Sequence, residues 1–131
     1  MRRAIILILT VILGLTTSLD AQHIVRATKY YGGIGCGMIT ASGSRINNQR
    51  VNDFKDRWIA LSQDMFKLGY KFNDTIYVES DVKALEGKWV VKDKMGKKMK
   101  KSIDFLMTKG NSKTFRTPCK VKIRKINSKK K

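Results

Sequence analysis

The sequence predicts a small, mainly β domain folded as a closed barrel. It contains about six or seven short runs rich in β-branched and aromatic residues, and turn signals recur roughly every ten residues. Very little of the chain has a helical pattern. A length of 131 residues suits one domain. A barrel is the economical arrangement of so many short strands, because closure removes exposed strand edges.

The predicted strands follow one another with short polar connections. They lie at residues 24–31, 57–62, 75–79, 88–93, 103–107 and 119–124. In the third of these, Ile76 and Val78 fall on one face. The last alternates strictly, with apolar residues directed inward and basic residues outward, which is typical of a strand with one solvated face.

The connections contain one predicted helical segment. Residues 63–69 read as one or two helical turns that end at Gly69. Residues 32–37 hold four glycines and form a loop that can approach another surface closely. We expect residues 44–56 to be a polar segment and residues 108–118 a polar connection.

The N-terminal 21 residues are typical of a secretory signal peptide. Two arginines precede an apolar run at residues 4–15, and a short polar stretch ends at Ala21. The run is short for a membrane-spanning helix, which needs roughly 20 apolar residues. An uncleaved anchor is the alternative. We therefore expect an exported domain at residues 22–126 with a basic tail at 127–131. It would lie in the periplasm, the envelope or the medium, and meet the membrane only transiently through the signal peptide.

The charge predicts an anionic partner. The formal net charge is +18, which attracts polyanions. For a protein exported from a bacterial-type cell these are wall polymers, lipopolysaccharide or released DNA. Nucleic acid is an alternative, but the chain carries no recognised nucleic-acid motif. The one histidine, His23, has no metal-ligand spacing around it, so we expect no metal and no cofactor.

Two cysteines, Cys36 and Cys119, allow one disulfide. An even cysteine count in an exported chain favours a bridge. Two free thiols are the alternative.

Two aspartates stand out because of their apolar surroundings. Asp93 ends a hydrophobic run, and Asp104 lies within another. A carboxylate in such a place costs free energy unless it has a partner or a chemical task. The alternative is a structural role, because aspartates at strand ends commonly stabilise turns or cap the segment that follows.

Several short motifs together resemble the three-aspartate domain and its relatives among rare lipoprotein A-like proteins. In order they are Ala-Thr-x-Tyr-Tyr at 27–31, Thr-Ala-Ser-Gly at 40–43, Ile-Ala-Leu-Ser-x-Asp at 59–64 with Leu-Gly at 68–69, Asp-Thr-Ile-Tyr-Val at 74–78, Val-x-Asp at 91–93 and Ile-Asp at 103–104. The resemblance spans residues 25–126. It implies a six-stranded double-psi β-barrel and a role at the cell wall.

The resemblance also implies a site and a reaction. Asp64, Asp93 and Asp104 match the three aspartates of the family, with Asp104 as acid/base and Asp93 in support. The implied activity is a lytic transglycosylase that acts on peptidoglycan glycan strands with a single acid/base. Asp104 would then need a raised pKa, which the apolar residues beside it and the charge of Asp93 would supply.

Three further residues are candidates for contacting the substrate: Tyr31, Thr40 and Ser42. The loop after Asp93 departs from the glycine pattern of the family, since it reads Lys-Met-Gly-Lys-Lys-Met-Lys-Lys. A non-catalytic, basic peptidoglycan-binding module of the same fold is therefore the alternative function. We expect a monomer in either case.

Overall fold

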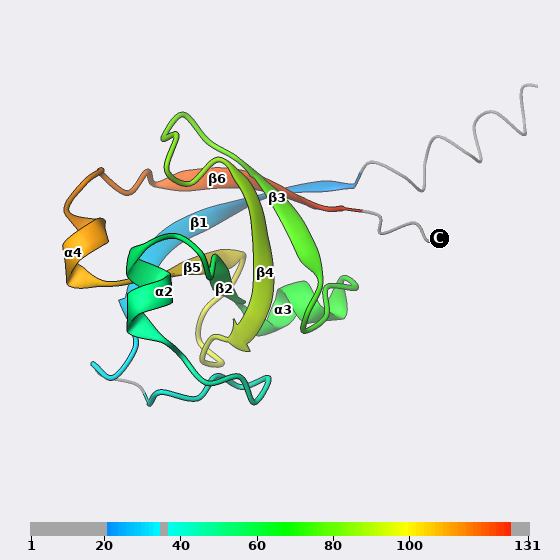
Figure 1. Ribbon diagram of the computed structural model, residues 1–131. Coiled ribbons are helices and arrows are strands. Elements are labelled where there is room, and N and C mark those ends of the chain that lie inside the picture. Colours follow the sequence, from blue (N-terminus) through cyan, green and yellow to red (C-terminus); the bar gives the residue numbers. More distant parts are fainter. Residues whose placement is uncertain (1–20, 35–36, 127–131) are drawn as a thin grey trace, which may run out of the picture.

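The computed structural model describes residues 21–34 and 37–126, which form a closed six-stranded barrel (Figure 1). The strands are β1 (Gln22–Tyr31), β2 (Trp58–Leu61), β3 (Thr75–Glu79), β4 (Gly87–Lys94), β5 (Ser102–Met107) and β6 (Lys120–Lys125). Around the barrel their order is β1-β5-β2-β4-β3-β6. The predicted mainly β barrel is confirmed, and all six strands lie where the sequence places them, within two residues at each end.

The barrel mixes parallel and antiparallel pairs. β1 pairs with β5 in parallel, and β2 pairs with β4 in parallel. The other four neighbouring pairs are antiparallel. Parallel neighbours cannot be joined by a tight hairpin, and neither pair is consecutive in the chain: β2, β3 and β4 come between β1 and β5, and β3 comes between β2 and β4.

Alternation along the strands fills the core. Ile76 and Val78 of β3 and Ile123 of β6 are almost fully buried, as the pattern predicts. Trp89 of β4 packs edge-on against Phe105 of β5, with ring centroids 4.9 Å apart. Each large side chain buried in this way contributes roughly 1.5–3 kcal/mol to folding.

Three short helices lie outside the barrel in the described part of the chain. α3 (Gln63–Lys67) occupies the predicted position, and Gly69 follows it with a φ of 114°. The other two, α2 (Asn48–Asn52) and α4 (Lys109–Ser112), lie within the predicted polar segments, where no helix was predicted. Polar side chains start them: the Asn47 carboxamide accepts from the Arg50 amide, and α4 has a capping box.

A second apolar cluster fixes the connection between β1 and β2 on the outside of the barrel. Ile46 and Val51, from this connection, bury against Leu106 of β5. Tyr30, Met38 and Trp58 complete the cluster. Because it holds α2 and its preceding loop against the barrel wall, it also sets the position of residues 40–43.

Some predictions fall outside the described residues: the signal peptide but for Ala21, the tail at 127–131, and the partner cysteine Cys36. Cys119 is exposed, and its pairing stays a prediction. In the part of the chain that the structure describes, no helix is long and apolar enough to cross a membrane.

Candidate functional site

Four residues form a row across four neighbouring strands. Thr28 of β1 pairs with Asp104 of β5, Asp104 pairs with Ala60 of β2, and Ala60 pairs with Asp93 of β4. The two carboxylates therefore flank Ala60, and their Cα atoms lie about 10 Å apart, since neighbouring strands are spaced by about 4.8 Å. The fold thus brings together the two aspartates that stood out in the sequence.

A β-bulge in β4 gives Asp93 its orientation. Ile59 pairs with Val91, but the next residue of β2, Ala60, pairs with Asp93, so Lys92 has no partner on β2. Strict alternation after buried Val91 would direct Asp93 into the core. The extra residue instead puts Asp93 on the outer face, beside Ala60.

This row lies in a cleft of about 460 Å³. Its lining combines the aspartates with apolar side chains and two lysines: Thr28, Lys29, Tyr30, Ile34, Ala60, Asp93, Lys94, Met95, Gly96, Met99 and Asp104. Carboxylates beside an apolar wall form a surface suited to a sugar chain, whose rings have both polar edges and apolar faces.

Asp104 has a raised pKa, as expected of a general acid. Its side chain is half-buried, and its Oδ1 accepts a hydrogen bond from the Thr28 hydroxyl at 2.9 Å. Burial raises the pKa of Asp104, the Thr28 hydrogen bond opposes that rise, and the charge of Asp93 adds to it. Ile103, Phe105 and Leu106 were expected to supply the apolar setting; Ile103 and Phe105 lie in the core instead, and Leu106 lies in the second apolar cluster.

The Asp93 carboxylate is held by three donors. Its Oδ1 accepts hydrogen bonds from two backbone N–H groups, that of Ala41 at 2.8 Å and that of Lys94 at 2.9 Å. The Tyr30 hydroxyl donates to Oδ2 at 3.4 Å. These contacts fix the orientation of the carboxylate in the cleft.

Asp64 lies outside the cleft lining. It belongs to the first turn of α3, where the Ser62 hydroxyl donates to it at 2.6 Å. The Lys101 N–H donates to its other oxygen at 3.0 Å. Burial alone would raise the pKa of Asp64, but these hydrogen bonds lower it overall. Asp64 thus fastens the end of the loop that leads into β5.

The three candidate substrate contacts also lie beside the cleft, not in its lining. The Tyr31 hydroxyl contacts Ser112 Oγ at 3.1 Å, and its ring packs against the barrel core. Thr40 is buried, and its hydroxyl contacts that of Ser42 at 2.9 Å within a tight turn. The turn docks on β4 through the Ser42 N–H, which donates to the Lys92 carbonyl. Its contribution to the site is the backbone amide of Ala41.

Of the site residues predicted from the sequence, only Asp93 and Asp104 line the cleft; the lining residues that were not predicted include Thr28, Tyr30 and Ala60. Thr28 and Tyr30 belong to the first motif of the resemblance, and alternation puts them on the same face of β1, opposite to that of Tyr31. This alternation of side chains along β1 was the feature of the sequence that could have identified Thr28 and Tyr30 as cleft residues. Ala60 carried none, because its place between two aspartates depends on strand register.

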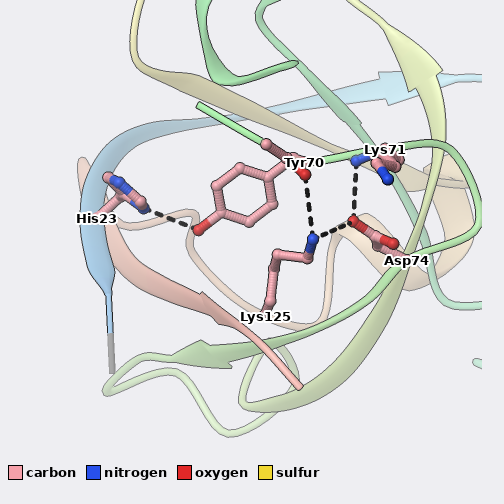
Figure 2. Close-up of polar contacts among 6 residues, drawn as sticks. His23, Tyr70, Lys71, Asp74 and Lys125 are labelled. Carbon is pink, nitrogen blue, oxygen red and sulfur yellow. Dashed lines mark hydrogen bonds and ion pairs between the residues drawn. The ribbon is translucent and has the colours of Figure 1, made fainter. Parts of the chain in front are cut away.

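A second polar cluster ties the start of β1 to the rest of the barrel (Figure 2). His23 Nδ1 lies 2.8 Å from the hydroxyl of Tyr70, whose ring is buried. Lys125 of β6 donates to the Gly69 carbonyl and pairs with Asp74 at 3.3 Å. Burial, with a smaller contribution from Asp74, raises the pKa of Tyr70 to about 12. These contacts join three segments and have a structural role.

Elsewhere in the described residues, the clusters of polar side chains and the hollows differ in chemistry from the cleft. Within residues 21–34 and 37–126, no group of three or more His, Cys, Asp or Glu side chains is arranged to hold a metal ion. A hollow of about 410 Å³ lies over β3 and β6, but its lining contains the exposed ion pair of Lys122 and Glu79 and no aspartate pair like that of the cleft.

A comparison with solved structures supports the fold. No family model and no curated protein matches the sequence. Among solved structures, an expansin of Clavibacter michiganensis, crystallised in its apo form, matches with a TM-score of 0.54 and 12% sequence identity. The match covers 85% of this chain and 53% of the expansin, so the chain spans about half the length of that protein. At this identity the likeness shows a shared fold.

Proposed function

We propose that this chain is an exported cell-wall protein that binds a peptidoglycan glycan strand in the cleft and cleaves it as a lytic transglycosylase. Asp104 is the acid/base and Asp93 supports it. The observation that carries the proposal is the half-buried Asp104, whose pKa is raised, in one cleft with Asp93. The ordered motifs of the three-aspartate resemblance and the fold shared with an expansin support it.

A single carboxyl group is enough for this reaction. The protonated Asp104 donates its proton to the glycosidic oxygen, and the bond from that oxygen to the anomeric carbon breaks. The anomeric carbon belongs to an N-acetylmuramic acid residue. The resulting carboxylate then takes the proton of the C6 hydroxyl of that residue, and the C6 oxygen bonds to the anomeric carbon to close a 1,6-anhydro ring. The acid is regenerated and no water is consumed, unlike hydrolysis by two carboxylates. A raised pKa keeps a larger fraction of Asp104 protonated as pH increases.

The test is digestion of purified sacculi followed by mass analysis of the soluble products. The wild-type chain is expected to release 1,6-anhydromuropeptides. Asp104→Asn should lower that release by about 100-fold or more, because general acid–base catalysis contributes factors of about 10²–10⁴. The pH dependence should show activity falling as Asp104 ionises.

Asp81→Asn is the matched control. Asp81 is exposed on the connection between β3 and β4 and does not line the cleft. The substitution makes the same change of charge and should leave release unchanged. Anhydromuropeptide release by the Asp104→Asn protein at the wild-type rate would rule out Asp104 as the acid.

The second candidate is a non-catalytic module that holds an anionic wall polymer. The net charge of +18 and the lysines beside the cleft favour it. It predicts that the protein co-sediments with sacculi, that the bound fraction falls as salt is added, and that no soluble glycan appears.

A further inference from the structure

The loop between β4 and β5, residues 95–101, concentrates positive charge next to the cleft. It contains Lys97, Lys98, Lys100 and Lys101, and no acidic residue lies between Asp93 and Asp104. We call it the lysine loop. Among the described residues, none of its lysines forms an ion pair. The charge of Lys100 helps to lower the pKa of Asp64.

Hydrogen bonds fasten the lysine loop at both ends. At its start, the Met95 N–H donates to the Leu61 carbonyl at 2.9 Å, and the Gln63 side chain donates to the Met95 carbonyl at 3.2 Å. At its end, Lys101 has a φ of 42° and donates its N–H to Asp64. A loop fastened in this way loses less conformational entropy when it binds a ligand.

The end of the loop is further fixed by two serines. The Ser102 N–H donates to the Ser62 hydroxyl at 3.0 Å, and the Ser102 hydroxyl donates to the Lys100 carbonyl at 2.7 Å. Ser62 and Ser102 are fully buried. The buried serines and Asp64 therefore serve to hold the loop in one conformation.

The two sides of the lysine loop differ in chemistry. Met95 and Met99 line the cleft, whereas Lys97, Lys98 and Lys100 are exposed. Lys94, just before the loop, has its ammonium over the rings of Phe66 and Phe72, at 5.1 and 5.6 Å from their centroids. The loop thus forms an apolar wall of the cleft with a cationic outer rim.

We propose that the lysine loop binds anionic groups carried by the glycan in the cleft, namely the carboxylates of its side substituents. The inference rests on the proposed function, since it assumes a glycan in the cleft. The apolar wall contacts the sugar rings, and the exposed ammonium groups face substituents that project past the rim. The substrate class is then a carboxylate-bearing glycan strand, and a neutral strand is a poorer ligand.

The test compares binding of two triple variants made in the full chain with Asp104→Asn, so that cleavage does not affect the measurement. The loop variant is Lys97→Gln, Lys98→Gln and Lys100→Gln. The control variant is Lys83→Gln, Lys88→Gln and Lys109→Gln, which removes three exposed lysines located elsewhere. The ligands are soluble peptidoglycan glycan fragments with free carboxylates and the same fragments with the carboxylates amidated.

The loop variant should bind the carboxylate fragments about tenfold more weakly, as expected when three exposed charge contacts are lost. Its affinity for the amidated fragments should not change, and the control variant should lose less than threefold. Equal losses in the two variants would show that bulk charge attracts the glycan and would overturn the inference. Tighter binding to duplex DNA than to glycan, lost in the loop variant, would overturn it in favour of a nucleic-acid site.

A further arm uses a poly(glycerol phosphate) polymer to distinguish the source of the anion. A loss on carboxylate fragments alone supports the proposal as stated. A loss on the phosphate polymer alone would assign the loop to phosphate groups and overturn the carboxylate assignment. Because these measurements involve no turnover, a failure of catalysis in the sacculus digestion leaves the binding result standing, and the reverse also holds.

Discussion

Asp104 shows how its neighbours set the chemistry of one side chain. Burial favours its neutral form, and so does the negative charge of Asp93, whereas the Thr28 hydroxyl donates to its carboxylate. Because the folded-state pKa is raised, the neutral carboxyl contributes stability that is fully present below the ordinary pKa of aspartate. That stability is lost as pH rises through the raised value. The protein therefore gives up some stability at neutral pH to keep an acid in the cleft.

Two substitutions should move the pKa of Asp104 in opposite directions. Thr28→Val removes the only one of its three influences that lowers the pKa, so the pKa should rise further. Asp93→Asn removes the neighbouring charge, so the pKa should fall toward its ordinary value. The measurement is a ¹³C NMR titration of the Asp104 carboxyl in each protein.

Asp53→Asn is the control for that titration, because Asp53 is exposed and contacts Gln49 at the end of α2. Loss of the Asp53 charge should leave the titration of Asp104 unchanged. Shifts of the same sign in Thr28→Val and Asp93→Asn would contradict the assigned causes.

At the scale of elements, the ends of the strands are fastened by a few side chains. The contact between His23 and Tyr70 joins β1 to the connection between α3 and β3 (Figure 2). Asp64 and the buried serines fix the lysine loop in a comparable way. Short strands with few ladder hydrogen bonds depend on such contacts to keep their register.

Tyr70→Phe should therefore lower the free energy of unfolding by about 0.5–1.5 kcal/mol, the net value of one hydrogen bond whose partner remains. The ring stays, so packing is retained. The pKa of Tyr70 is raised from 10.0 to about 12, so neutral Tyr70 contributes stability below pH 10 that is lost as pH rises toward 12. Chemical denaturation at pH 7 and at alkaline pH measures both effects.

Tyr77→Phe provides the comparison, since the Tyr77 hydroxyl donates to Glu86 at the surface. It should cost less stability than Tyr70→Phe. An unchanged free energy of unfolding in Tyr70→Phe would show that the contact between His23 and Tyr70 does not fasten β1.

At the scale of the whole molecule, charge opposes compaction. The chain has a formal net charge of +18, and the described residues contain three ion pairs. Like charges on a small surface repel one another and destabilise the folded state. The same charge raises the rate of encounter with an anionic polymer.

Added NaCl should therefore stabilise this protein. Between about 20 mM and 500 mM salt, the Debye length falls from roughly 20 Å to about 4 Å, which screens most of the repulsion. We expect Tm to rise by roughly 3 °C, equivalent to about half a kcal/mol. Calorimetry at fixed pH measures this change in Tm.

The variant with glutamine at positions 97, 98 and 100 should show a smaller rise, because it has three fewer positive charges. A Tm that falls with salt would mean that the ion pairs outweigh the repulsion.

The sequence by itself determined the six strands and the buried faces of β3 and β6, because alternation and composition are local properties of each strand. The register between the strands determined which residues come together in the cleft. Pairing between strands far apart in the sequence aligned Thr28, Asp104, Ala60 and Asp93, and the bulge at Lys92 turned Asp93 outward. Register between distant strands and the position of a bulge depend on the packing of the whole barrel, which the pattern of a single strand does not contain.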